Sequence, residues 1–277
     1  MARWSSPWTI RRLAAEPPLR MLTQLAVQVL PGSIRRKAAW DVVARPEYLV
    51  GVLEGADLAS RDGISEICVI EFGVAGGSGL VAMQSYAEAV ERETGIRIKV
   101  YGFDTGTGLP QHCGDYRDHP DSWKAGDYVM QHERLRPLLQ SRTELVLGNI
   151  SETVTRFVTE IQNAPIGFIS VDVDFYSSST AALKVLSLPE KRMQRRVPMA
   201  FDDVDSSANH RFAGELLAIR EFNRLDSHVK IDRWRGLRRN RPFFEAPWLK
   251  NMYMAHDLEA VSKAALKREL VDLPLER

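Results

Sequence analysis

Glycines and a carboxylate meet where an apolar run of the sequence stops. In VIEFGVAGGSGL (69–80), Glu71 stands two residues before Gly73, and three more glycines follow. Missing side chains let a ligand approach the backbone, and the N–H groups at the start of a following helix point outward. The spacing at the expected strand end is Glu71-x-Gly73-x-x-x-Gly77, and its acidic residue favours a cationic or donor-bearing ligand over a pyrophosphate. S-adenosylmethionine, which has a sulfonium and an ammonium but no phosphate, is such a ligand.

A dinucleotide fingerprint competes for the same glycines. Gly77-x-Gly79-x-x-Ala82 satisfies the loose G-x-G-x-x-G/A pattern, but it begins four residues after the strand is expected to end at Gly73. Asp104 ends the next apolar run, where a carboxylate can accept both ribose hydroxyls. That position alone does not separate S-adenosylmethionine from NAD. A carboxylate such as Asp104 could also cap nearby backbone N–H groups instead of binding a ligand.

Four more carboxylates follow two later apolar runs. Asp172 and Asp174 end VDVD, and Asp202 and Asp203 end FDD. If the first of these strands stays extended, Asp172 and Asp174 leave it on the same side. Four carboxylates in one crevice repel one another unless they are protonated or bind a cation, and a hard divalent ion such as Mg²⁺ is the economical resolution. The alternative is that some of them cap the helices that follow.

The apolar periodicity predicts strands that alternate with helices. The expected elements are a helix from Pro46 to near Gly63, strand 66–72, helix 78–95, strand 96–104, helix 131–140, strand 143–149, helix 151–161, strand 166–174, a short helix, strand 197–203, helix 211–223, and two further strands in HVKIDRW and KNMYMAHD. Near-continuous apolar strands alternating with helices indicate a parallel sheet covered on both faces. Ligands of such sheets lie beyond the carboxyl ends of the strands. We therefore expect an α/β, Rossmann-like fold.

Five motifs, in their order and spacing, resemble class I S-adenosylmethionine-dependent methyltransferases. They are VIEFGVAGGSGL, VYGFDTGTGLP, LVLGNISETV, ISVDVDFYSSS and AFDDV. Within that class they are similar to the metal-dependent sugar and natural-product O-methyltransferases typified by macrocin O-methyltransferase, in a bacterial branch of the group. The likeness covers about residues 46–226. It implies a mostly parallel seven-stranded sheet and methyl transfer to a hydroxyl of a sugar or small natural product.

The resemblance also implies roles for individual residues. The turn that would wrap the methionine part of the cofactor contains Gly73, Val74, Ala75 and Gly77, beside Glu71. The ribose would lie on Asp104 with Thr105, and the adenine on Gly148, Asn149 and Ile150. Mg²⁺ would be bound by Asp172, Asp202 and Asp203. Asp174 would be the general base, so Asp172 and Asp174 are the catalytic candidates, and His210 is a reserve base.

Two segments depart from the family pattern. LPEKRMQRRVPM replaces the usual Gly-Gly turn before the fifth strand, and Gly106-Thr107 replaces the common acidic-aromatic pair after Asp104-Thr105. These changes leave the acceptor open beyond the macrolide sugars. Five arginines crowd the connection between the last two strands: Arg233, Arg235, Arg238, Arg239 and Arg241. We expect them on a solvated hairpin, with recognition of an anionic acceptor as the alternative.

Charge is nearly balanced overall but unevenly spread. The net charge of the 277 residues is +1, yet residues 1–40 hold seven Lys or Arg against Glu16 alone. We expect residues 1–45 to form a basic helical extension, a lid or a dimer arm, and residues 46–277 to form one S-adenosylmethionine-binding domain. An arm for an anionic membrane or a nucleic acid is the less favoured alternative. No nucleic-acid partner is expected, and a homo-oligomer is left open.

Cysteine usage and hydropathy indicate the compartment. Cys68 and Cys113 give no disulfide framework. No apolar stretch approaches the roughly 20 residues that span a bilayer, and the N-terminus lacks the pattern of a signal peptide. We therefore expect a cytoplasmic protein without a transmembrane segment.

Two other classes of function stay open from the sequence. A NAD(P)-dependent reductase could use Asp104 but needs a Tyr-x-x-x-Lys pair or an equivalent, which no expected strand end supplies. A non-catalytic cofactor-binding protein would keep Glu71 to Asp104 while its acidic residues stayed free of metal.

Overall fold

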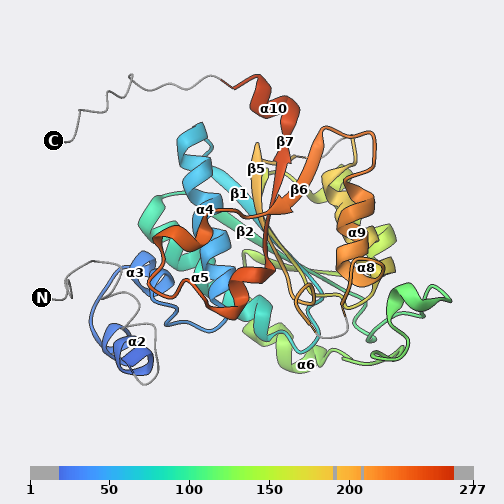
Figure 1. Ribbon diagram of the computed structural model, residues 1–277, viewed down its shortest axis with the longest axis horizontal. Coiled ribbons are helices and arrows are strands. Elements are labelled where there is room, and N and C mark those ends of the chain that lie inside the picture. The colour runs from blue at the N-terminus through green and yellow to red at the C-terminus, as the bar shows by residue number, and fades with distance from the viewer. Residues whose placement is uncertain (1–18, 190–191, 207–208, 265–277) are drawn as a thin grey trace, which may run out of the picture.

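The strands form one mixed sheet. The computed structural model describes residues 19–189, 192–206 and 209–264, and in that part of the chain seven strands pair in the order β3-β2-β1-β4-β5-β7-β6 (Figure 1). Their bounds are β1 Glu66–Phe72, β2 Arg97–Asp104, β3 Thr143–Leu147, β4 Ile166–Val171, β5 Arg196–Phe201, β6 Val229–Arg233 and β7 Met252–Asp257. β1 to β5 are parallel, and β7 runs antiparallel to both β5 and β6. The predicted α/β, Rossmann-like class is confirmed.

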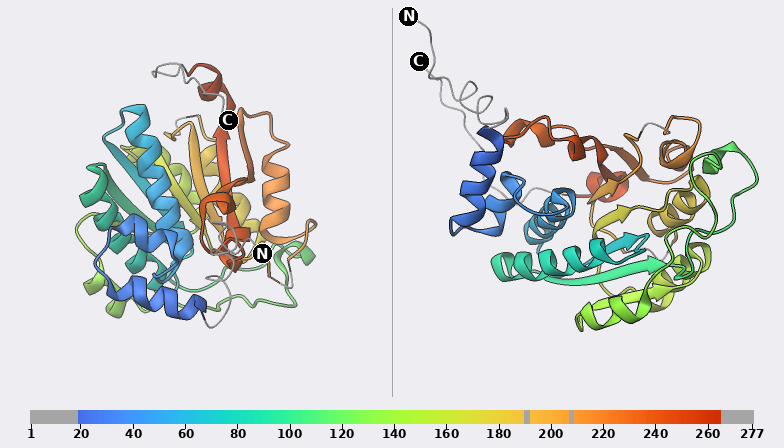
Figure 2. Two further views of the ribbon diagram at one scale, coloured as in Figure 1. Left: turned by 60° about the vertical axis from the view of Figure 1, so that its left-hand side comes forward. Right: turned by 90° about the horizontal axis from the view of Figure 1, so that it is seen from below.

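Helices cover both faces of this sheet (Figures 1 and 2). Their bounds are α2 Leu19–Val29, α3 Ile34–Ala39, α4 Pro46–Asp62, α5 Ser78–Thr94, α6 His132–Leu135, α7 Ile150–Arg156, α8 Tyr176–Leu183, α9 Gly214–Phe222 and α10 Leu258–Ser262. Side chains of a strand alternate between its faces. Ile67 and Val69 of β1 accordingly pack with α4 and α5, whereas Ile70 and Phe72 pack with α7, α8 and α9. None of the described helices is long and apolar enough to cross a membrane.

Several elements are shorter than expected from the sequence. The helix expected at 131–140 is only α6, followed by a 3₁₀ turn over Arg136–Leu138. Pro137 explains this, because proline lacks the N–H that an α-helix would donate to the carbonyl four residues earlier, and its ring crowds that carbonyl. β3 ends at Leu147 because Asn149 caps α7, accepting from the Ser151 N–H.

β4 and β5 also stop early, and this affects the acidic residues. β4 ends at Val171, not at residue 174, and β5 ends at Phe201, not at residue 203. Asp174 has a left-handed φ of 57°. The strand is therefore not extended through Asp174, and the same-side argument for Asp172 and Asp174 does not hold. The helix expected at 211–223 begins only at Gly214.

The N-terminal extension packs against the loop before β7. Phe243, Ala246 and Leu249 form a small buried cluster against Trp40. Arg241, 7% exposed, donates from Nη2 to the Ala38 carbonyl at 2.8 Å and pairs with the buried carboxylate of Asp41. Its guanidinium also lies over the Trp248 ring at 4.6 Å.

The expected solvated hairpin is therefore wrong for Arg241, which anchors the extension. It holds for Arg235, which is exposed and pairs with Asp232 at 3.0 Å. The sequence showed five arginines crowded in one short segment, and only the packing separates the buried Arg241 from the exposed ones.

Candidate active site

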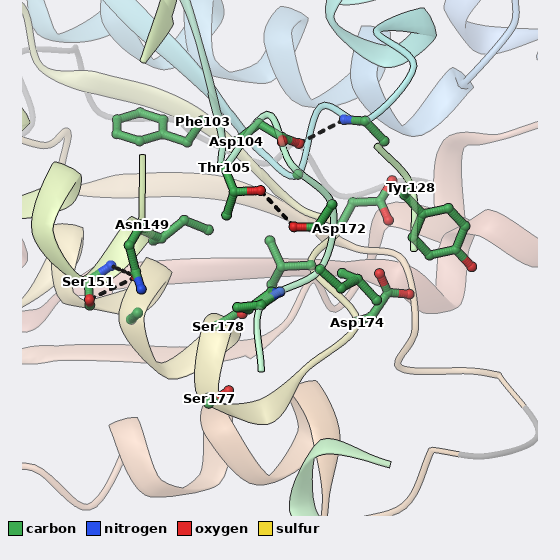
Figure 3. Close-up of a pocket in the computed structure, with 18 of the residues that line it drawn as sticks. Phe103, Asp104, Thr105, Tyr128, Asn149, Ser151, Asp172, Asp174, Ser177 and Ser178 are labelled. Atoms are coloured by element: carbon green, nitrogen blue, oxygen red, sulfur yellow. Dashed lines mark hydrogen bonds between the residues drawn. The ribbon is translucent and has the colours of Figure 1, made fainter. Parts of the chain in front are cut away.

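A cavity of about 280 Å³ lies at the carboxyl edge of the parallel strands. The segments that follow β1, β2, β3 and β4 line it (Figure 3). Eight of the residues singled out from the sequence are in its lining: Gly73, Ala75, Asp104, Thr105, Asn149, Ile150, Asp172 and Asp174. Six are not in its lining: Glu71, Val74, Gly77, Gly148, Asp202 and Asp203.

The turn after β1 depends on glycine. Gly73 has φ 89°, and a Cβ there would stand 1.7 Å from the Asp172 carbonyl oxygen. Gly77, with φ 87°, precedes α5, and a Cβ there would stand 2.3 Å from the Leu135 side chain. A left-handed φ and such close contacts together exclude other residues without rearrangement. The backbone at Gly73 and Ala75 therefore forms one wall of the cavity.

Asp104 supports this turn. Its Oδ2 accepts from the Val74 and Ala75 N–H groups at 2.9 and 2.8 Å, and its Oδ1 accepts from the Gly106 N–H at 2.7 Å. A carboxylate offers about four lone-pair sites, so little capacity remains to accept both ribose hydroxyls. The contacts of Asp104 therefore show the alternative role that the sequence left open, in which its carboxylate caps nearby backbone N–H groups. Its side chain still lines the cavity.

Glu71 lies behind the cavity wall. Its side chain is 1% exposed, Oε1 accepts from the Tyr48 hydroxyl at 2.7 Å, and Oε2 has no hydrogen-bond partner among the described residues. Burial raises the pKa of Glu71 to about 8. A Cβ on Gly79 would stand 2.0 Å from Oε1, which places the carboxyl group against the first turn of α5. Glu71 therefore packs between α4 and α5, and it is not part of the cavity lining.

The end of β3 supplies the opposite wall. Gly148 has φ 131° and donates to the Asp104 carbonyl at 2.9 Å, which turns the chain into α7. Asn149 accepts from the Ser151 N–H at 3.0 Å and from the Ser151 hydroxyl at 2.8 Å. Asn149, Ile150 and Ser151 face the cavity together.

Carboxylates gather at the other end of the cavity. We call Asp172, Asp174, Asp202 and Asp203 the acidic cluster. Burial, and after it the charges of the other members, raises the pKa of Asp172, Asp174 and Asp203 to about 7 each. The sequence prediction that these four converge is consistent with this mutual repulsion, because carboxylates that are far apart would not shift one another.

Three further charged residues belong to this end and were missed from the sequence. Glu47 repels Asp172, and Arg45 approaches Asp172 with 3.7 Å between Nη1 and Oδ2. Glu215 is fully buried, its Oε2 accepts from the Asp203 N–H at 3.0 Å, and its Oε1 has no partner in the described part of the chain. Arg45 and Glu47 precede β1 by some twenty residues, and no spacing in the sequence linked them to the strand ends.

The donor atoms and the charge of the acidic cluster are of the kind that binds a divalent cation. It offers oxygen donors and an excess of negative charge, which Mg²⁺ prefers. Within the described ranges, however, no three His, Cys, Asp or Glu side chains stand close enough together to hold a metal ion. An ion bound by Asp172, Asp202 and Asp203 would require these side chains to rotate toward one another.

His210 is not brought to the cavity. It is exposed and lies beside His119, with 5.5 Å between the two ring centroids. It has no place in the cavity lining.

The strand order, with one antiparallel strand inserted before the last, and a cavity at the carboxyl edge define the fold of class I S-adenosylmethionine-dependent methyltransferases. Solved structures show the same likeness. The calicheamicin methyltransferase CalS11 is 21% identical, with a TM-score of 0.53, covering 91% of this chain and 93% of its own. The O-methyltransferase NovP is 16% identical, with a TM-score of 0.50, covering 76% of this chain and 94% of its own. No family model and no curated protein matches the sequence.

Proposed function

We propose that the protein is an S-adenosylmethionine-dependent O-methyltransferase that acts on a hydroxyl group of a sugar or small natural product. One observation carries this proposal. A single cavity joins the glycine turn after β1 and the ends of β2 and β3 to the carboxylates that follow β4. A cofactor on the glycine turn would therefore reach the acidic cluster, where an acceptor hydroxyl could be deprotonated.

Different residues of the cavity lining would bind the cofactor and exclude water. Gly73 and Ala75 would let the cofactor approach the backbone, and Asn149 and Ile150 would flank its base. Apolar side chains from the described lining, Phe103, Leu109 and Pro110, would exclude water from the transfer. Methyl transfer is an in-line displacement, so the acceptor oxygen must be held close to the sulfonium carbon.

Asp174 is the proposed general base. It lines the cavity, and its pKa of about 7 is close to the pH at which a base works best. Asp172, Asp202 and Asp203 are the proposed holders of Mg²⁺. When bound, a divalent cation lowers the pKa of a hydroxyl group near it and fixes its position.

Calorimetry with the full-length protein tests the cofactor class. S-adenosylmethionine or S-adenosylhomocysteine should bind, and Asp104→Ala should weaken binding by about 1.5–3 kcal/mol, because it removes the acceptor that holds the glycine turn. The exposed Asp226→Ala is the matched control and should bind as the parent protein does.

The same titration with NADH and NADPH separates the alternatives. Tight binding of either dinucleotide without any response to S-adenosylhomocysteine would overturn the methyltransferase proposal in favour of a reductase. Cofactor binding without any affinity for Mg²⁺ or Mn²⁺ would favour a binding protein that carries out no metal-dependent transfer.

A further inference from the structure

The cavity is lined by carboxylates and by no basic side chain. Asp104, Asp172 and Asp174 line it, and none of the described lining residues is Lys, Arg or His. S-adenosylmethionine, the proposed cofactor, carries a carboxylate of its own in its methionine part. A carboxylate that enters such a cavity is repelled unless a cation stands close to it.

Arg45 supplies a cation beside this lining. Its Nη1 lies 3.7 Å from Asp172 Oδ2, and its side chain is 33% exposed. Asp172 in turn adjoins the glycine turn, because its N–H donates to the Phe72 carbonyl at 2.9 Å and a Cβ on Gly73 would stand 1.7 Å from its carbonyl oxygen. Arg45 is therefore next to the wall at which Gly73 lets a ligand approach the backbone.

The guanidinium of Arg45 has hydrogen-bond donors to spare. It carries five N–H donors. Within the described ranges its side chain makes one hydrogen bond, from Nη1 to the Tyr48 hydroxyl at 3.4 Å, and its contact with Asp172 is longer than a hydrogen bond. A guanidinium binds a carboxylate most strongly through two parallel hydrogen bonds. The remaining donors are free to bind a ligand carboxylate in this way.

Tyr48 fixes the direction of the Arg45 side chain. The guanidinium lies over the Tyr48 ring, 5.2 Å from its centroid. Tyr48 is 2% exposed, and its hydroxyl donates to Glu71 Oε1 at 2.7 Å, so the ring is held on both sides. A guanidinium that already rests on a fixed ring loses little conformational freedom when it binds a ligand.

The backbone of Arg45 is strained and is held from the side of the extension. Its φ and ψ are 50° and 64°, a left-handed conformation that is unfavourable for any residue except glycine. The carbonyl before it accepts from the Tyr86 hydroxyl, and Asp41, which also has a left-handed φ of 52°, pairs with Arg241. Strained residues that surrounding contacts hold in place are concentrated at ligand sites. The segment 41–45 therefore connects the anchor of the extension to the cavity.

We propose that Arg45 binds the carboxylate in the methionine part of S-adenosylmethionine, and that the anchored extension holds Arg45 in position to do so. This inference rests on the proposed function. Arg45 precedes α4 and belongs neither to the glycine turn nor to a strand end. The affinity for the cofactor then depends on the anchor of the extension as well as on the carboxyl edge of the sheet.

Two ligands that differ by one group test the contact. S-adenosylhomocysteine carries the carboxylate, whereas decarboxylated S-adenosylhomocysteine keeps the amine and the adenosine but lacks it. Each is titrated by calorimetry into the full chain. The parent protein should bind S-adenosylhomocysteine about 10–100-fold more tightly, because the hydrogen bonds between charged groups are lost with the carboxylate.

Variants of Arg45 locate the effect. Arg45→Met should weaken S-adenosylhomocysteine about 10–100-fold and should not weaken the decarboxylated ligand, whose binding also shows that the variant is folded. Arg45→Lys keeps the charge but not the planar fork, so its affinity should lie between those of the parent and Arg45→Met. Arg61→Met is the matched control, because Arg61 is an arginine of α4 that is 64% exposed and pairs with Glu54.

Arg241→Met tests the connection to the extension. It releases Asp41 from the loop before β7, so it should weaken S-adenosylhomocysteine about threefold and leave the decarboxylated ligand unchanged. Added to Arg45→Met it should cause no further loss, since both changes then act through the same contact. Arg235→Ala, at an exposed arginine of the same connection, is the control.

Three results would overturn the role of Arg45. They are equal affinity of the parent protein for the two ligands, unchanged affinity for S-adenosylhomocysteine in Arg45→Met, and an equal loss of both ligands in that variant, which would mean that Arg45 only supports Asp172. An effect of Arg45→Met without any effect of Arg241→Met would overturn the role of the extension. Failure of the proposed function is distinguishable from these, because a parent protein without affinity for either adenosyl ligand would reject the methyltransferase and the inference together.

Discussion

Glu71 illustrates how burial can change the role of a residue that looks like a ligand. In the fold its carboxyl group is enclosed and hydrogen-bonded to Tyr48, and its pKa is raised from 4.5 to about 8. At neutral pH the group is therefore mainly protonated in the native state and ionised in the unfolded chain. A raised carboxyl pKa contributes stability below pH 4.5 that is lost as the pH rises toward 8.

Glu71→Gln should remove this pH dependence. The amide keeps an oxygen that can accept from the Tyr48 hydroxyl, and it does not ionise. Relative to the variant, the parent protein should lose of the order of 2–4 kcal/mol of unfolding free energy between pH 5 and pH 8. Urea unfolding at several pH values measures this difference. A constant difference between the two proteins across that range would show that Glu71 is already ionised at low pH.

The members of the acidic cluster should not be equivalent. Replacing Asp172, Asp202 or Asp203 by Ala removes a proposed ligand and should abolish Mn²⁺ binding, measured by paramagnetic resonance. Asp174→Asn should spare metal affinity and reduce turnover by about 10²–10⁴-fold, as expected for loss of a general base. Turnover is followed as release of S-adenosylhomocysteine in the presence of sugar and small natural-product acceptors.

The contrast between the variants is the test. Loss of Mn²⁺ in Asp174→Asn would make Asp174 a ligand and leave the base unassigned. Full turnover after exhaustive chelation would remove the metal from the proposal altogether.

Among the elements, the loop before β7 depends on one buried ion pair. Burial lowers the pKa of Arg241 and raises that of Asp41, so for both groups desolvation outweighs their mutual attraction. Such a pair adds little net stability, but removing one partner leaves a buried charge uncompensated.

Arg241→Met should therefore destabilise the protein by about 3–5 kcal/mol, and adding Asp41→Asn should recover part of that loss. Chemical denaturation of the parent, Arg241→Met and the double variant measures the loss of unfolding free energy and its partial recovery. The exposed pair gives the control, since Arg235→Ala should change stability by only about 0–1 kcal/mol. An equal effect of Arg241→Met and Arg235→Ala would mean that the loop is not anchored through Arg241.

For the whole molecule, the extension divides into an anchored part and an exposed part. Removing residues 1–40 would delete Ala38 and Trp40, which pack on the loop before β7. A truncated protein that keeps these contacts should therefore lack residues only up to the end of α2. α2 itself carries Met21, Leu22, Leu25 and Val29, each more than half exposed. Figure 2 shows this helix at the periphery, away from the sheet.

We expect a second copy of the chain to cover this face of α2. Arg20 is the only charged residue of the helix, and its guanidinium lies over the Phe243 ring at 4.8 Å, whereas helices that bind anionic membranes carry a basic polar face. The cores of protein interfaces are similarly depleted of charge. Leu22→Glu with Leu25→Glu should therefore lower the molecular mass measured by light scattering and leave S-adenosylhomocysteine binding unchanged.

The exposed Leu225→Glu is the matched control for that experiment and should keep the parent mass. A parent protein that is monomeric at every concentration would contradict the expected contact.

The sequence alone determined the order of the elements and placed the ends of β1 to β5 to within about three residues. Apolar runs of strand length alternate with helical periodicity, and this local pattern already requires a sheet covered on both faces. It also placed Gly73, Asp104, Asn149 and Asp172 at or near the ends of four different strands. Since parallel strands share one carboxyl edge, these residues had to meet there, and the cavity lining contains all four.

Tertiary structure decided what each side chain does at that edge. Burial and the approach of α4 turned Glu71 into an enclosed acid, and three backbone N–H groups occupied Asp104. Arg45, Glu47 and Glu215 reach the site from segments that no local pattern connects with it. Hydrogen bonds and desolvation depend on which distant segments pack together, and periodicity records only whether a residue faces the core.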